Sequence, residues 1–199
     1  MNKFEQVGNI SETEPVKNEL EEDIIRVKEI LGLSEEDFRN KTTLDLGAGS
    51  ANLARYFEGR DDINIISLDL ESERLKLADG AVQADAKKLP FRDESFDLIA
   101  ELGGPAGLEE NPNDTKSILS EMKRVLRPDG EIRIGRGYLS PTMFEDPGED
   151  LSLEERKQYF REQSRRLIES IGFDVEEIDT GDDLYDFYYR LRKQQESEQ

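Results

Sequence analysis

Residues 44–54 read LDLGAGSANLA, and this stretch decides the fold. Leu44 and Leu46 flank a single acid, which is typical of the end of a short buried strand. Gly47 and Gly49 follow at once, and glycine lets the chain turn tightly and lets backbone N–H groups approach a ligand. The next residues have helical spacing. The stretch therefore predicts a strand, a glycine turn and a helix, in that order.

Strand-like and helix-like segments alternate on both sides of this stretch. Residues 14–32 carry apolar side chains at helical spacing, which predicts an amphipathic N-terminal helix. The helix before the fifth strand is expected to be capped by Asp114 and closed by Pro128 and Gly130. Further strands are predicted at residues 63–70, 81–85, 96–102, 131–135, 173–179 and 184–193.

This alternation predicts an α/β fold. Strands that alternate with helices form a parallel sheet covered on both faces. The last two strands are separated only by a short TGDD turn, so they should pair antiparallel. We expect a Rossmann-like, doubly wound sheet of seven strands, mostly parallel, with a C-terminal antiparallel hairpin strand. One domain spans residues 1–199, with a flexible segment at 1–13, the helix at 14–32 and the core at 42–199.

Composition argues against several classes of function, although a local basic groove for a nucleic-acid substrate is not excluded. The 199 residues include 47 acidic and 27 basic side chains, a formal charge of −20, which argues against binding to nucleic-acid backbones or anionic lipid. The chain has no cysteine and no histidine, so disulfides, thiolate zinc sites and hydrolytic triads are poor candidates and no metal is expected. No apolar run reaches the roughly 20 residues of a membrane span, and the polar N-terminus does not resemble a signal peptide. We therefore expect a cytoplasmic protein without membrane partners.

The acidity has three interpretations. A charge this large destabilises a folded chain by self-repulsion unless ions screen it, so a host with a salt-filled cytoplasm would explain it. A generally acidic bacterial protein or a surface for a basic partner are the alternatives. The lysine content, including Lys87 and Lys88, is higher than a salt-loving host predicts.

An acid follows the glycine turn at an informative distance. Asp69 ends the second predicted strand, 20 residues after Gly49, where an acid can accept hydrogen bonds from both hydroxyls of an adenosine ribose. Ligands of open parallel sheets bind beyond the carboxyl ends of the strands, where the strand order reverses. A tight turn without any ligand remains the alternative for the glycines alone.

From residue 44 to 134 the chain resembles the class I S-adenosylmethionine (SAM)-dependent methyltransferases. The resemblance rests on LDLGAGSANLA, on the segment from ISLDLESERL to FDLIA, and on RVLRPDGEIRIG. The family motif is acidic-x-Gly-x-Gly-x-Gly, and Ala51 stands here in place of its last glycine. The final reversed strand also suits the family. The resemblance implies an enzyme that transfers a methyl group from SAM.

The resemblance also implies the residues that hold the cofactor. Asp45 would hold the methionine amino group, and Gly47 and Gly49 would line that end with backbone. Asp69 would bind the ribose hydroxyls. The remaining implied residues are Leu70 beside the adenine, Asp85 and the amide of Ala86 at the adenine edge, and Glu101, which stands after the fourth strand where the family often places a backbone carbonyl near the amino group of the ligand. Capping of a turn is the alternative for Asp85 and Asp69.

The acceptor and any catalytic residue cannot be read from the sequence. Methyl transfer from a sulfonium requires mainly alignment, so neither cysteine, histidine nor metal is needed. We expect a small-molecule acceptor. Gly103 and Gly104 form either a simple loop, the favoured interpretation, or a pocket floor, and Tyr138 and Phe144 are candidate walls. A non-catalytic binding module of the same fold and an NAD(P)-dependent oxidoreductase remain alternatives. The sequence leaves the oligomeric state open.

Overall fold

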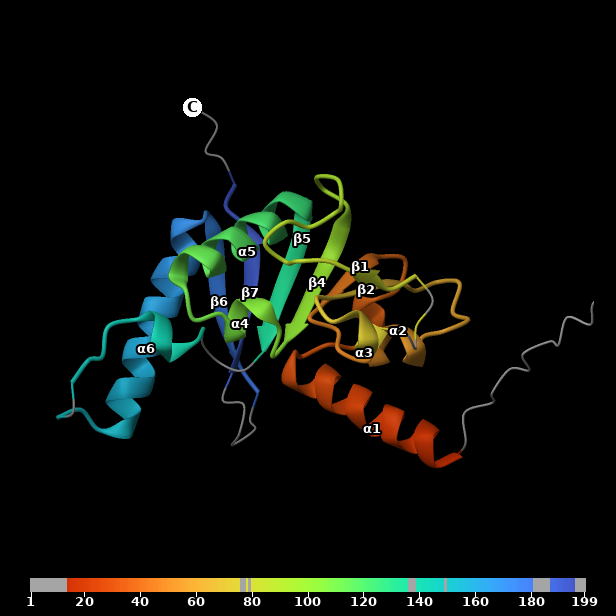
Figure 1. Cartoon of the computed structure of the whole chain (residues 1–199), viewed down its shortest axis with the longest axis horizontal. Helices are drawn as coiled ribbons and strands as arrows, with labels where there is room; N and C mark the ends of the chain where they lie inside the picture. The colour runs from red at the N-terminus through yellow and green to blue at the C-terminus, as the bar shows by residue number, and fades with distance from the viewer. Residues whose placement is uncertain are drawn as a thin grey trace, which may run out of the picture.

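The computed structural model describes residues 14–75, 78, 80–135, 139–148, 150–180 and 187–195. A single twisted sheet crosses the middle of the molecule, and helices cover both of its faces (Figure 1). The predicted flexibility of residues 1–13 concerns a segment outside the described residues.

The sheet has seven strands in the order β3-β2-β1-β4-β5-β7-β6. β7 pairs antiparallel with both β5 and β6, and the other neighbours are parallel. The chain moves outward from β1 to β3 and then returns to β4 on the other side of β1, so the strand order reverses between β1 and β4. The predicted Rossmann-like sheet with a reversed C-terminal strand is thereby confirmed. The strands are β1 (Thr42–Leu46), β2 (Asn64–Asp69), β3 (Val82–Gln83), β4 (Phe96–Leu102), β5 (Leu126–Gly135), β6 (Phe173–Asp179) and β7 (Phe187–Lys193).

The helices divide between two apolar cores, one on each face of the sheet. One core joins the sheet to α5 and α6, and the other joins it to α1 and α2. Figure 1 shows α6 beside β6 at one end of the sheet and α1 below the other half. The helices are α1 (Glu14–Ile30), α2 (Asn52–Tyr56), α3 (Ser72–Leu75), α4 (Pro105–Leu108), α5 (Pro112–Val125) and α6 (Leu153–Ser170), with 3-10 turns η1 (Glu35–Asp37) and η2 (Pro141–Met143).

The α1 helix docks on the sheet through the stripe that its sequence predicts. Leu20, Ile24 and Leu31 are buried against β4 and α2. The end of the helix is tied to β5 by Arg133, whose guanidinium donates to the carbonyl oxygens of Leu31 and Gly32. This attachment places one face of α1 at the carboxyl end of β1.

The predicted boundaries of α5 are wrong at both ends. Asn111, not Asp114, caps the helix: its side-chain oxygen accepts a hydrogen bond from the N–H of Asn113 at 3.0 Å, and Pro112 occupies the first turn, where its fixed φ is favourable. The helix ends at Val125, before the expected Pro128 and Gly130. Leu126 is already extended because it pairs with Phe96 in the sheet.

Candidate functional site

The glycine turn after β1 packs against the turn after β4. Gly47 has a φ of +75°, and a Cβ on it would lie 2.7 Å from the Cα of Gly104 and 3.0 Å from the Cδ of Pro105. Its N–H and that of Ala48 both donate to the carbonyl oxygen of Leu68, at 2.9 and 3.0 Å. Glycine is therefore required at residue 47 both by the backbone conformation and by the space available.

Alanine at the third position of the motif adopts a glycine-like conformation. Ala51 has φ 54° and ψ 36°, in the left-handed region, and its side chain is fully buried at the start of α2. This conformation is uncommon for residues with a Cβ. The motif therefore keeps its backbone path although one glycine is replaced.

Asp69 ends β2, as predicted, and its carboxylate faces the glycine turn. One oxygen, Oδ2, accepts a hydrogen bond from the N–H of Gly49 at 2.9 Å, and Oδ1 accepts one from the N–H of Glu71 at 2.9 Å. Each carboxylate oxygen can accept a further hydrogen bond. The two backbone bonds thus fix the carboxylate and leave capacity for a ligand with two adjacent hydroxyls.

Beyond the ends of β2 and β3 lies a cavity of about 310 Å³, here called the β2 cavity. Five of the eight predicted cofactor residues line it: Gly47, Asp69, Leu70, Asp85 and Ala86. Its lining residues are Gly47, Leu68, Asp69, Leu70, Glu71, Ala84, Asp85, Ala86, Lys87, Gly103, Gly104, Pro105, Leu108, Glu109 and Ile118. The predicted pocket floor at Gly103 and Gly104 is part of this wall.

Two exposed leucines line the β2 cavity from different elements. Leu70, after β2, is 66% exposed, and Leu108, at the end of α4, is 60% exposed. Contact of large apolar side chains with water is unfavourable. A flat apolar ligand that covered these two side chains would therefore gain binding free energy. Leu108 lies 38 residues from Leu70 and belongs to no motif, so the sequence alone does not distinguish it.

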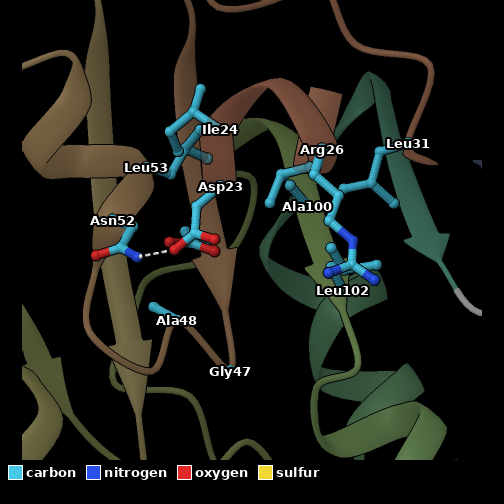
Figure 2. A pocket seen from close by; sticks show the side chains of 12 residues that line it. Asp23, Ile24, Arg26, Leu31, Gly47, Ala48, Asn52, Leu53, Ala100 and Leu102 are labelled. Atoms are coloured by element: carbon cyan, nitrogen blue, oxygen red, sulfur yellow. Dashed lines mark hydrogen bonds between the residues drawn. The ribbon is translucent and has the colours of Figure 1, made fainter. Parts of the chain in front are cut away.

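A second cavity, of about 260 Å³, lies between α1 and the ends of β1 and β4, and we call it the α1 cavity. Figure 2 shows the side chains of Asp23 and Arg26 descending from α1 into it, above the turn at Gly47 and Ala48. The Asn52 amide donates to the Asp23 carboxylate at 3.0 Å. The other lining residues are Ile24, Val27, Leu31, Asp45, Leu53, Ala100 and Leu102. Gly47 lines both cavities, so they meet at the glycine turn.

Asp45 lies at the floor of the α1 cavity. Burial raises the pKa of its carboxyl group to about 7; the hydroxyl of Ser67, which donates to Oδ2 at 3.2 Å, opposes the shift, and the nearby charge of Asp69 adds to it. A buried carboxylate of raised pKa gains free energy when a cation comes beside it. The position therefore favours a positively charged group of a ligand.

Three predicted residues, Gly49, Glu101 and Phe144, line neither cavity. Glu101 is fully buried and its side chain lines neither cavity, because it turns beneath α4. Phe144 also lines neither cavity and packs near Phe160, with ring centroids 6.5 Å apart. Tyr138 lies outside the described residues. Sequence reasoning missed Asp23 and Arg26 because nothing in the periodicity of α1 distinguishes a residue above a cavity from one in solvent.

Two further properties concern the described part of the chain. Its acidic side chains form no group of three or more that could hold a metal ion. None of its helices is both long and apolar enough to cross a membrane.

Comparison with known proteins agrees with this geometry. Residues 44–134 match the family described as a methyltransferase domain. A demethylmenaquinone methyltransferase of Lactobacillus johnsonii is 35% identical over 105 residues, which cover 46% of this chain and 41% of that protein. The chain thus matches less than half the length of this curated relative.

Solved structures share the whole fold at low identity. A crystal structure of a protein from Pyrococcus horikoshii superposes with a TM-score of 0.59 at 16% identity and covers 92% of both chains. The human N-acetylserotonin methyltransferase, solved with SAM, gives a TM-score of 0.58 at 17% identity over 88% of this chain and 54% of that one. With the domain match and the strand order, these likenesses show that the chain carries the domain and fold of the class I SAM-dependent methyltransferases.

Proposed function

We propose that this chain binds SAM across the two cavities and transfers its methyl group to a small molecule. One observation supports this most strongly: the α1 cavity and the β2 cavity meet at Gly47, with a strand-end carboxylate, Asp45 or Asp69, in each. A ligand with a nucleoside at one end and a charged tail at the other matches this pair of sites.

The β2 cavity fits the adenosine end of the cofactor. The carboxylate of Asp69, fixed by two backbone N–H groups, would accept hydrogen bonds from the ribose hydroxyls. Leu70 and Leu108 would contact the adenine ring, and both are exposed without it. Asp85 and the backbone of Ala86 line the same cavity and would meet the polar edge of the ring.

The α1 cavity fits the methionine end. Its floor carries Asp45, whose partly buried carboxylate would pair with the ammonium group. Arg26, which lines the cavity from α1, would pair with the carboxylate of the ligand. The lining thus carries both signs of charge, as a zwitterion does, and Ile24, Val27 and Leu53 supply an apolar wall for the methylene groups of the ligand.

When bound, the cofactor supplies an electrophilic methyl carbon on a sulfonium. The chain itself would hold the two ends of the cofactor, align the acceptor with the carbon–sulfur bond and exclude water. Alignment alone can supply up to about 7–11 kcal/mol of the barrier. Proton removal is needed only when the acceptor starts protonated. These demands suit a site without cysteine, histidine or a metal cluster in the described residues.

A small-molecule acceptor is supported by the relatives. The Lactobacillus protein is named for demethylmenaquinone, and a Burkholderia thailandensis methyltransferase of the same fold, with a TM-score of 0.51 and 16% identity, was solved with 1,6-didemethyltoxoflavin. The negative charge of the chain disfavours nucleic acid as an acceptor. The acceptor itself is to be identified by experiment.

Calorimetric titration with SAM and with NAD tests the cofactor. We expect heat with SAM and none with NAD; the reverse would support the oxidoreductase alternative. Asp69→Asn keeps an acceptor oxygen but removes the charge, and should weaken SAM binding by about 10–100-fold. Asp61→Asn, at an exposed carboxylate near the opposite end of β2, is the matched control and should bind as the wild type does.

Incubation with labelled SAM and a fractionated extract of the host cell, with small molecules, protein and nucleic acid kept as separate fractions, tests the transfer. Methyl label should appear in a small molecule and not in protein or nucleic acid. Tight SAM binding without label in any fraction would favour a non-catalytic binding module.

A further inference from the structure

Glu101 is a buried carboxyl group that the proposed chemistry does not use. It lies at the end of β4, is fully inaccessible to solvent, and lines neither cavity. Oε1 accepts a hydrogen bond from the N–H of Gly107 at 3.1 Å, and Oε2 has no hydrogen-bond partner among the described residues. Burying a carboxyl group is costly. A leucine at this position would avoid that cost, so the polar group needs a local reason.

The reason lies in the start of α4. The first N–H groups of a helix have no partner within the helix, and a side chain at the N-cap normally accepts from them. Here the N-cap is Gly104, which has no side chain. A Cβ on Gly104 would lie 2.6 Å from the Cγ of Glu101 and 2.6 Å from the carbonyl oxygen of Leu46. The close packing that excludes a capping side chain at residue 104 is thus made by Glu101 together with the backbone of Leu46.

We propose that Glu101 is a positioning residue: it caps α4 from inside the fold and thereby holds residues 103–108 in the shape that the β2 cavity requires. Pro105 and Leu108 of α4 line that cavity. Gly104 in turn is the surface against which Gly47 packs, with 2.7 Å between the Cα of Gly104 and a Cβ built on Gly47. One carboxyl group therefore supports the wall of the β2 cavity and the glycine turn together.

Two substitutions separate capping from the mere filling of space. Glu101→Gln keeps an acceptor oxygen for the N–H of Gly107. Glu101→Met has a similar unbranched shape but no acceptor. The effect of these substitutions on cofactor affinity rests on the proposed function. The ligand used to measure it is S-adenosylhomocysteine, which is stable during titration. We expect Glu101→Gln to bind within about 3-fold of the wild type and Glu101→Met to bind at least 10-fold more weakly.

A matched control removes a buried polar atom elsewhere in the sheet. The hydroxyl of Thr43 is buried and lacks a hydrogen-bond partner among the described residues, and Thr43 lies near the start of β1, away from the glycine turn. Thr43→Val should leave the affinity for S-adenosylhomocysteine unchanged. A similar loss in Thr43→Val and Glu101→Met would assign the effect to general loosening of the core and overturn the positioning role.

Hydrogen exchange of the ligand-free protein gives a second readout that needs no cofactor. The amide of Gly107 should exchange at least 10-fold faster in Glu101→Met than in the wild type and near the wild-type rate in Glu101→Gln. If the wild type binds no S-adenosylhomocysteine, the proposed function fails. The exchange rate of the Gly107 amide in the Glu101 variants then tests by itself whether Glu101 caps α4. Unchanged exchange in Glu101→Met would overturn the proposal.

Two other results would also overturn it. Glu101→Gln could lose as much affinity as Glu101→Met, which would show that the acceptor oxygen is irrelevant. In Glu101→Met, the amide of Gly107 could exchange faster while the affinity for S-adenosylhomocysteine stays at the wild-type value. That result would show that Glu101 caps α4 but does not position the wall of the β2 cavity. If Glu101→Met does not fold, Glu101→Asp withdraws the carboxyl group by one methylene and should itself raise the exchange rate of Gly107; a wild-type rate in that variant refutes the cap.

Discussion

Gly47 and Gly104 meet so closely that no side chain fits between the two turns that carry them: a Cβ on Gly47 would lie 2.7 Å from the Cα of Gly104. Gly47→Ala should therefore lower the free energy of unfolding by about 2–4 kcal/mol, the sum of strain at a φ of +75° and of overpacking against backbone. It should also abolish SAM binding. Urea unfolding followed by calorimetric titration measures both effects.

Gly59→Ala is the control for backbone strain without overpacking. Gly59 has a φ of +78°, close to that of Gly47, but a Cβ on it would meet no atom within 4 Å. We expect a loss of only about 1 kcal/mol and unchanged SAM binding. Equal destabilisation by the two substitutions would show that the contact with Gly104 is not restrictive.

The parts of the fold that the sequence predicted correctly are those set by local pattern. Leu44 and Leu46 mark β1 because alternation is a short-range signal, and the acid at Asp69 marks the end of β2. Because parallel strands all end at one edge of the sheet, strand-end residues from separate strands meet there, and the β2 cavity brings together Asp69 and Asp85 as expected.

The parts that the sequence could not predict depend on packing between distant segments. Arg26 lies above the α1 cavity only because α1 crosses the sheet where it does, and the hydrophobic stripe of α1 fixes its buried face but not its position along the strands. The start of α5 was misplaced because Asn111 and Asp114 are both competent caps, and Pro112 selects the first. The turn of Glu101 beneath α4 depends on the missing side chain of Gly104.

Arg133 should be a major source of stability through the docking of α1. It is 4% exposed and donates to the carbonyl oxygens of Leu31 and Gly32, and its guanidinium lies 3.1 Å from the carboxylate of Asp37. Arg133→Met would leave the buried carbonyl oxygen of Leu31 without its donor and would remove the bonds to Gly32 and Asp37. We expect a loss of about 3–5 kcal/mol in urea unfolding and faster hydrogen exchange at the end of α1.

Arg192→Met provides the comparison for an exposed ion pair. Its side chain is 57% exposed and pairs with Glu131 at 3.0 Å. Solvent screens such a pair, so the loss should be below about 1 kcal/mol. A loss in Arg133→Met as small as that in Arg192→Met would mean that α1 is held by its apolar stripe alone.

Asp45 should make the stability of the ligand-free protein depend on pH. Burial raises its pKa to about 7 in the folded chain, from an ordinary value of 3.8. The unfolded chain therefore releases this proton first, and the ionised carboxyl group destabilises the fold as pH rises from about 4 to 7. Asp45→Asn removes this penalty, so its stability relative to the wild type should increase over that interval by about 2–4 kcal/mol and then level off.

Unfolding in urea at half-unit steps from pH 4.5 to 8.5 measures this difference. A constant offset between Asp45→Asn and the wild type at every pH would contradict the assignment. The affinity for SAM should change with pH in the opposite direction to the stability. An ammonium group favours the ionised carboxylate of Asp45, so the affinity of the wild type for SAM should rise from pH 6 to pH 8. In Asp45→Asn the affinity should be weaker and should lose most of that rise.

The large negative charge predicts that salt stabilises this chain. With a formal charge of −20, self-repulsion opposes folding, and at molar salt the Debye length falls to about 3 Å. The unfolding temperature should therefore rise from low to molar KCl, as the interpretation of a salt-adapted protein requires. Glu21 and Glu22 are exposed on α1, and replacing both with Gln should raise the unfolding temperature at low salt and reduce the gain from KCl. A flat or falling curve in the wild type would refute salt adaptation and leave the acidity to a basic partner or to general composition.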